Sequence, residues 1–268
     1  MVSKFANKTV EELKEICRQK NITGYSKLKK EDLIKLVKKN SKRKNVKVKK
    51  LKKGGANNNK LIRTDEDIKK AVNDWLTDEN EATKLYGDIS NWDTSNVTNM
   101  NYLFSNYELN GLKFLNKFNH DISNWNVSKV TTMEGMFAGA KEFNQPIGSW
   151  NVSNVENMAH MFENAKAFNQ PIGDWKVSNV ENMAHMFYKA TTFNQPIGSW
   201  DVWIVTNMYH MFDEATAFNQ PIDLWNVSEV TNMYYMFNEA TAFNQPIGNW
   251  NVSKVTNMYR MFYRAYAF

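Results

Sequence analysis

The chain has 268 residues, 42% of them hydrophobic, and a formal net charge of +6 at pH 7. Residues 1–63 hold 21 Lys/Arg and 5 Asp/Glu, a net charge of +16, whereas residues 64–268 hold 13 and 23, a net charge of −10. We therefore expect a basic N-terminal module that binds a polyanion, followed by an acidic body. The single cysteine, Cys17, excludes an intrachain disulfide, and no apolar run approaches the roughly 18 residues of a membrane span.

The first residues, MVSKFANKTVEELKE, carry charges where a secretion signal would have its apolar stretch. We therefore expect no signal peptide and an intracellular protein, located in the nucleus or associated with a virion. Residues 1–40 then predict two short helices joined by an extended loop. Thr9 and Glu12 form a capping box at the start of the first helix, and the stretch Thr23–Ser26 interrupts the helical pattern before the second.

The segment ELKEICRQKNITGYSKLKKEDLIKLV closely resembles the SAP and Rho-N-terminal-like modules. The resemblance implies a small all-α domain that binds nucleic acid through the loop and the start of the second helix. Of the two nucleic acids we favour DNA over RNA. The positions that correspond to this surface are Gly24, Tyr25, Ser26, Lys27, Lys29 and Lys30.

Residues 41–63 predict a basic, flexible linker. Eight basic residues and no acidic residue lie between Lys42 and Lys53. Runs of this kind neutralise nucleic-acid phosphates whatever the base sequence, and they also serve as nuclear-import signals. A solvated linker that binds nothing has the same composition. Next to the preceding module we favour nucleic-acid binding by Lys42, Arg43, Lys44, Lys47, Lys49, Lys50, Lys52 and Lys53.

Residues 64–86 predict one amphipathic helix, with Thr64 as its N-cap and with Ile68, Val72 and Trp75 on its apolar side. Because the open end of a stack of repeats must be covered, we expect this helix to cap the repeats of residues 87–268. Extra residues near Asn106–Lys117 interrupt the first repeat and predict a surface loop.

A strict 25-residue period governs the remaining chain and implies a solenoid with one supersecondary unit per copy. The sequence Phe-Asn-Gln-Pro-Ile begins at Phe143, Phe168, Phe193, Phe218 and Phe243. Stacked copies would place Phe on Phe, Trp on Trp and Met on Met, and Asn144 and Gln145 with their repeats would form amide ladders.

Within one copy, the residues from Ile147 to Val152 predict a short strand. The apolar residues from Val155 to Ala165 predict a short helix, with Ser153 as its N-cap. The glycine after Ile147, repeated in most copies, indicates a turn with a positive φ.

Residues 64–268, with YGDISNWDTSNVTNM and FNQPIGSWNVSNVENMAHMF, closely resemble the BspA-like repeat family, DUF285, relatives of leucine-rich repeats. The resemblance implies an α/β repeat fold, for which we expect a right-handed, leucine-rich-repeat-like solenoid that contacts proteins and has no enzymatic activity. Together with the basic N-terminal region it suggests an adaptor between nucleic acid and a protein. A surface adhesin with no role in nucleic-acid binding is the alternative.

Several surface residues could mark further sites. His160, His185 and His210 share one column and could hold a metal ion, but helical spacing would place them opposite the core, so we favour an exposed surface and assign no metal or other cofactor. Exposed aromatic residues are favoured in protein contacts. The candidate protein-contact residues are Trp203, Ile204, Tyr209, Tyr234 and Tyr259.

Overall fold

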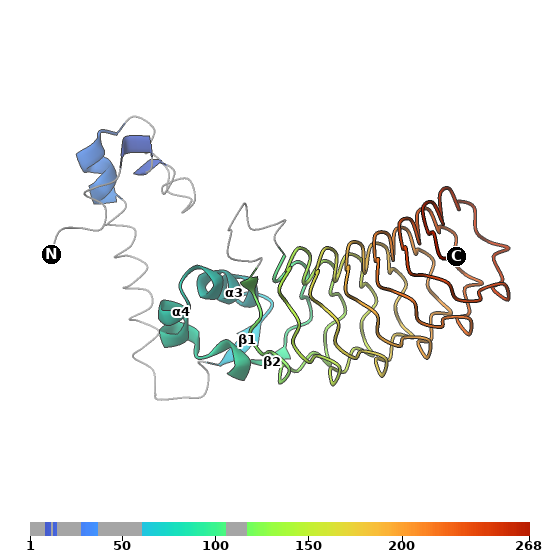
Figure 1. Cartoon of the computed structure of the whole chain (residues 1–268). Helices are drawn as coiled ribbons and strands as arrows, with labels where there is room; N and C mark the ends of the chain where they lie inside the picture. Colours follow the sequence, from blue (N-terminus) through green and yellow to red (C-terminus); the bar gives the residue numbers. More distant parts are fainter. Residues whose placement is uncertain (1–8, 12, 15–27, 37–60, 106–116) are drawn as a thin grey trace. The chain divides into compact units, whose positions relative to one another are not determined.

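The computed structural model in Figure 1 describes residues 9–11, 13–14, 28–36, 61–105 and 117–268. The chain divides into two compact units, Met1–Asn57 and Asn58–Phe268. The smaller unit contains the predicted helix–loop–helix segment, and the larger unit contains the predicted cap and the repeats.

The described part of the smaller unit has two helical stretches around a minimal apolar core. Val10 and Leu13 lie in the first stretch, and residues 30–36 form the second. Leu13 and Leu33 are fully buried, and the partly buried apolar residues packed against them are Val10, Leu28, Ile34 and Leu36. The predicted loop at residues 23–26 lies outside the described residues.

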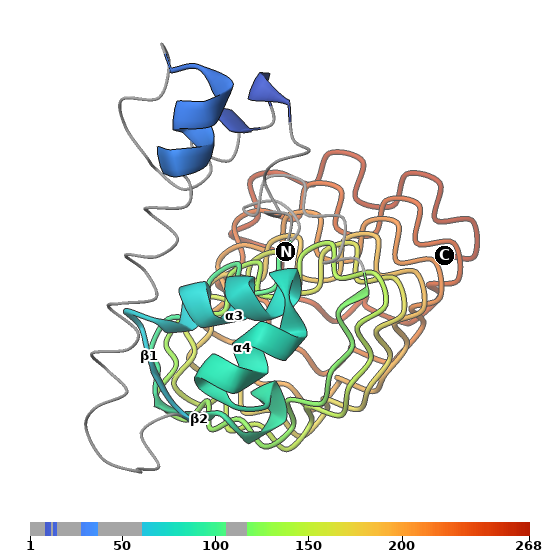
Figure 2. The ribbon, with the colours of Figure 1, turned by 90° about the vertical axis from the view of Figure 1, so that its left-hand side faces the viewer.

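The larger unit begins with a small cap. Strand β1 (Ile62–Thr64) pairs in parallel with β2 (Asp93–Asn96), and between them in sequence come α3 (Ile68–Thr77), α4 (Glu79–Tyr86) and the 3-10 helix η2 (Ile89–Asn91). Figure 2 shows α3 and α4 lying over one end of the stack of repeats. The apolar face of α3 belongs to the same continuous core as the repeats, so the cap shields the first of them.

The single helix predicted over residues 64–86 is wrong, because the chain turns at Asp78 and starts a second helix. Asp78 has φ −157° and ψ 89°, and its side chain accepts a hydrogen bond from the Glu81 amide at 3.2 Å. Such a side chain satisfies an amide that has no carbonyl partner in the first turn. Thr64 lies in β1 and not at an N-cap. The buried face is the predicted one: Ile68, Val72 and Trp75.

Each 25-residue copy, hereafter a rung, consists of turns and short extended stretches. Residues 118–268 contain no α-helix and no strand, only isolated parallel bridges between successive rungs, such as Asn157 with Asn182. The 25-residue repeat is therefore confirmed, but the α/β class is wrong for the rungs, because both the helix and the strand predicted within each copy are absent. The loop predicted near residues 106–117 lies almost entirely outside the described residues.

Backbone hydrogen bonds explain why no helix forms. The His160 amide donates to the Ala184 carbonyl of the next rung at 2.8 Å, whereas the Met161 amide donates to the Met158 carbonyl of its own rung at 3.2 Å. This alternation continues along the segment. An α-helix over residues 155–165 would instead send each amide to the carbonyl four residues earlier.

The apolar spacing is nevertheless the predicted one. In each turn an amide donates to the carbonyl three residues earlier, and the turns follow one another along the segment. They place side chains on the inner side at the same spacing as an α-helix does, so a chain of turns and a helix share one sequence pattern. The buried side chains are Val155, Met158, Met161, Phe162 and Ala165. Ser153 caps no helix; its amide donates to the side chain of Asn151 at 3.2 Å.

The core consists of aromatic columns that run through the rungs, as the sequence predicts. Phe162 and Phe187 stack with ring centroids 5.6 Å apart, and Trp175 and Trp200 stack at 6.5 Å. The indole of Trp200 also donates to the Ile172 carbonyl of the preceding rung at 3.1 Å. Each rung therefore contributes both apolar burial and hydrogen bonds to its neighbours.

The predicted amide ladder is confirmed. The Asn144 side-chain oxygen accepts hydrogen bonds from the Asn169 amide and from the Gln170 side chain of the next rung, both at 3.0 Å. The same pair of contacts recurs from Asn194 to Asn219 and Gln220. Because one oxygen binds two donors of the next rung, a residue inserted in any copy would break this ladder.

The repeated glycine has a different cause from the predicted one. Gly148, Gly173 and Gly198 are not among the residues with positive φ. A Cβ at Gly148 would instead lie 2.2 Å from the carbonyl oxygen of Pro171 in the next rung. Glycine is therefore required there by the close approach of two backbones.

Candidate functional site

Two of the residues predicted to bind nucleic acid fall within the described part of the smaller unit. Lys29 and Lys30 are both exposed at the start of the second helical stretch. The Lys29 carbonyl accepts a hydrogen bond from the Leu33 amide at 3.0 Å, so the turn that carries the two lysines is anchored to the apolar core. The other predicted residues lie outside the described residues: Gly24, Tyr25, Ser26, Lys27, Lys42, Arg43, Lys44, Lys47, Lys49, Lys50, Lys52 and Lys53.

The structure brings His160, His185 and His210, hereafter the histidine column, into one stack on the side of the larger unit. Ring centroids are 4.4 Å apart between the first two and 4.8 Å apart between the last two. All three have positive φ, from 53° to 59°. Histidine occurs in this left-handed region more often than most residues do. Tyr235 and Arg260 continue the column at equivalent positions with the same conformation.

Two carboxylates, which the sequence interpretation missed, lie beside this column. Glu163 Oε2 is 2.5 Å from His160 Nδ1, and Asp213 makes the equivalent contact with His210. The signal in the sequence is the spacing His-x-x-Glu/Asp. His185 departs from it, because Tyr188 stands three residues later and meets its ring edge-on at 5.4 Å.

His185 is the residue whose chemistry differs most from that of free histidine. Its Nδ1 is buried and has no hydrogen-bond partner. Burial first, and then the charges of His160 and His210, lower the pKa of His185 from 6.5 to about 4. Its imidazole is therefore neutral at pH 7 and retains a lone pair on one ring nitrogen.

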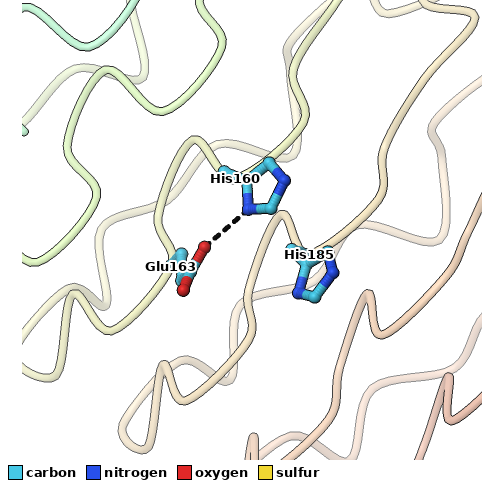
Figure 3. Close-up of side chains that lie close together, drawn as sticks. All are labelled: His160, Glu163 and His185. Atoms are coloured by element: carbon cyan, nitrogen blue, oxygen red, sulfur yellow. Dashed lines mark hydrogen bonds and ion pairs between the residues drawn. The ribbon is translucent and has the colours of Figure 1, made fainter. Parts of the chain in front are cut away.

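The three side chains His160, Glu163 and His185 form a group of possible metal ligands from two adjacent rungs, with one ligand atom from each lying within 4.8 Å of the others. Figure 3 shows the two imidazoles in the same orientation, each with a nitrogen on the side where Glu163 lies. The exposed surface predicted for His160, His185 and His210 is wrong in part, since all three histidines are partly buried. The prediction failed because it relied on helical spacing, and the rung contains no helix.

A second column contains the predicted protein-contact tyrosines. Tyr209 and Tyr234 stack with centroids 5.2 Å apart, and Tyr234 and Tyr259 at 5.6 Å. Tyr259 is 55% exposed, and the Arg260 guanidinium lies over its ring at 5.1 Å. The structure therefore joins the three tyrosines into one partly exposed aromatic surface.

Trp203 and Ile204 lie in a turn elsewhere in their rung. The Trp203 side chain is 52% exposed, whereas Ile204 is only partly exposed. Leu224, which sequence reasoning missed, is 84% exposed. It could have been found, because equivalent positions hold the polar residues Ser199 and Asn249.

Comparisons with known proteins agree with the division of the chain. Residues 6–45 match the N-terminal domain of the Rho termination factor, so the chain carries a Rho_N domain. Residues 56–111, 108–203 and 191–268 match the family described as a Mycoplasma protein of unknown function, DUF285. No curated protein and no solved structure matches the chain. No helix within the described ranges is long and apolar enough to cross a membrane. The repeat matches cover residues 56–268, and the chain therefore belongs to the DUF285 family.

Proposed function

We propose that this protein is an adaptor that binds nucleic acid through residues 1–63 and contacts a protein through its repeats. The observation that carries the proposal is the Rho_N domain, a nucleic-acid-binding module in Rho, at residues 6–45. It lies within residues 1–63, whose net charge is +16, while residues 64–268 carry −10. The proposed role is one of binding without catalysis, inside the cell, with DNA as the preferred nucleic acid.

The positive net charge of residues 1–63 suggests that the Rho_N domain and the basic run both contribute to nucleic-acid binding. A domain of about 40 residues buries little apolar surface, so we expect the Rho_N domain to bind only weakly by itself. The basic run from Lys42 to Lys53 adds phosphate contacts, which supply affinity without sequence choice and release counterions. The Rho_N domain would therefore orient the nucleic acid, and the basic run would hold it.

The aromatic surface of the repeats supports the second half of the proposal. Tyr259 and Trp203 are each about half exposed, and aromatic residues with exposed faces are the preferred anchors of protein contacts. Replacing Tyr209, Tyr234 and Tyr259 by Ser should abolish capture of a partner by the full chain, whereas replacing the exposed Lys129 by Ala should leave capture unchanged.

The nucleic-acid half is tested by fluorescence anisotropy with the full chain and a labelled DNA duplex over a range of salt concentrations. Each neutralised phosphate contributes about 0.9 to the slope of log affinity against log salt. Replacing Lys47, Lys49, Lys50, Lys52 and Lys53 by Ala should flatten this slope and weaken binding to all sequences alike. Replacing Lys27, Lys29 and Lys30 by Ala should weaken binding although the basic run is intact.

The matched control replaces three exposed lysines of the repeats, Lys129, Lys141 and Lys166, by Ala, which should leave both affinity and slope unchanged. An RNA duplex and a single strand of the same sequence measure the preference for DNA. Absence of binding at low salt, or an equal effect of the control, would show that residues 1–63 do not carry the affinity.

A further inference from the structure

One group of side chains in the repeats consists of possible metal ligands and includes a buried ring nitrogen that has no hydrogen-bond partner. His160 and Glu163 come from one rung and His185 from the next, and no role in the proposed function accounts for them (Figure 3). We propose that these three residues bind a divalent transition-metal ion, with Zn²⁺ as the ion that fits best.

The donor set suits zinc. Two imidazole nitrogens and one carboxylate oxygen are a common set of three protein ligands for this ion, with water in the fourth position. Softer metals prefer thiolates, and Mg²⁺ and Ca²⁺ prefer sites made of oxygen atoms alone. Glu163 supplies one negative charge, so the site would partly neutralise a divalent cation.

The geometry requires a small closure of side chains on a fixed backbone. Zinc–nitrogen bonds of about 2.0–2.1 Å in a tetrahedron place neighbouring ligand atoms about 3.3 Å apart. The three ligand atoms lie within 4.8 Å of one another. Glu163 Oε2 and His160 Nδ1, which are 2.5 Å apart in a hydrogen bond, must give up that bond and separate by about 0.8 Å to coordinate one ion. The ring of His185 must approach them by up to about 1.5 Å.

His185 is the residue best suited to this movement. Its Nδ1 is buried without a hydrogen-bond partner, and a buried polar atom in this state is costly. A bound cation would satisfy it.

The other half of the histidine column offers a matched control. Asp213 contacts His210 through one oxygen, and its other oxygen accepts a hydrogen bond from the Asn238 side chain at 2.6 Å. Both oxygens of this buried carboxylate are therefore engaged within the protein. His210 has the same backbone conformation as His185, so the same substitution can be made at either position.

The test measures Zn²⁺ binding to the metal-free full chain by isothermal titration calorimetry, with the visible absorption of Co²⁺ as a second probe. We expect one ion per chain. Loss of an outer-shell partner alone commonly weakens metal binding by about 10–100-fold, so His160→Asn and His185→Asn should each weaken it by at least about 100-fold. His210→Asn should leave the affinity unchanged. Asparagine is chosen because it tolerates positive φ.

A second measurement decides the matter if a variant fails to fold. The chain has four histidines, whose side-chain NMR signals can be followed in the wild-type protein as Zn²⁺ is added. We expect the signals of His160 and His185 to shift most and that of His120, beside Glu79 in the cap, to stay unchanged. Binding that persists in a variant carrying both His160→Asn and His185→Asn, or that depends equally on His210, would overturn the proposal.

Discussion

A glycine in each of three rungs allows the backbones of two neighbours to approach closely. A Cβ at Gly173 would lie 2.4 Å from the carbonyl oxygen of Pro196 in the next rung. The neighbour is backbone, so the rungs themselves would have to shift. Asp223 occupies the equivalent position in a later rung, which shows that one pair of rungs accommodates a Cβ. A side chain at Gly173 should therefore weaken the fold without abolishing it.

Gly173→Ala should lower the free energy of unfolding by about 1–3 kcal/mol, the usual cost of forcing extra atoms into a close-packed contact. The control is Gly248→Ala, where an added Cβ meets nothing within 4 Å. Urea-induced unfolding followed by tryptophan fluorescence measures both. Equal changes in the two variants would show that close approach is not the reason for glycine.

At the scale of the elements, the cap is attached to the first rung by the carboxylate of Asp65. Asp65, in the turn between β1 and α3, accepts hydrogen bonds from the Thr98 amide at 2.8 Å and from the Asn99 amide at 3.1 Å. Burial opposes ionisation, but these bonds and one from the Thr98 hydroxyl lower the pKa of Asp65 below 3.8. Three further aspartates in the same region have lowered pKa values: Asp88, Asp93 and Asp121.

Acid should therefore loosen the contact between the cap and the first rung. A carboxyl whose pKa is lowered on folding stabilises the folded state above its ordinary pKa, and this contribution is lost as the pH falls below about 3.8. The rungs use uncharged Asn151 and Asn226 in turns of the same kind, which do not titrate. Hydrogen exchange at pH 3 and pH 7 should show protection lost from α3 and α4 at the lower pH, and also from the rungs around His185, whose buried imidazole accepts a proton only below a pKa of about 4.

The matched variant is Asp65→Asn, which keeps an acceptor oxygen but loses the charge. Because Asp65 is largely exposed, its substitution should cost only about 1 kcal/mol at pH 7. The cost should fall as the pH drops below about 3.8, because the stabilisation by the charge is then progressively lost. A cost independent of pH would contradict the assigned role of the charge.

A rung is the smallest unit that can be removed without breaking the columns. Deleting one whole copy, residues 168–192, brings Phe143 and Phe193 into the contact that Phe143 makes with Phe168, at a centroid distance of 6.0 Å. The protein should remain folded, because each rung touches only its neighbours. Deleting five residues from the same copy should be far more damaging, since it shifts the columns and the amide ladder of that rung together.

Circular dichroism and thermal melting measure both deletions. The whole-copy deletion should retain a single sharp transition, and the five-residue deletion should broaden it or remove it. Equal damage from the two would mean that the rungs do not interact only with their neighbours.

At the scale of the whole molecule, the sequence correctly predicts the features that follow from the 25-residue period. Prediction fails where a helix and a chain of turns share one apolar pattern. The columns of Phe162 and Trp175 follow from the strict period, because equal spacing places equal residues on top of one another. The helix expected over residues 155–165 does not form, because a chain of turns buries the same positions and sends half of its amides to the next rung. Sequence spacing cannot distinguish these two cases.

The same limit applies to the candidate sites. The column of His160, His185 and His210 is visible in the sequence, but its partial burial depends on the true path of the rung. The position of Glu163 holds different residues in different copies and so does not stand out in the sequence. Only the turn in the structure brings this side chain beside His160. The basic run of residues 42–53 differs from these sites, because its charge alone suggests a nucleic-acid ligand and the prediction does not depend on the fold.

The alternation of backbone hydrogen bonds also gives the stack a polarity. Between residues 158 and 164, the amides that donate to another rung, such as that of His160, donate to the following one, whereas the Glu156 amide donates to Thr131 of the preceding rung. Two copies in the same orientation therefore always meet donor to acceptor, whereas an inverted copy would bring donors against donors. Tandem duplication preserves orientation, so a gene of this design can gain or lose copies by unequal crossing-over, and every new junction has the same hydrogen bonds as the old ones.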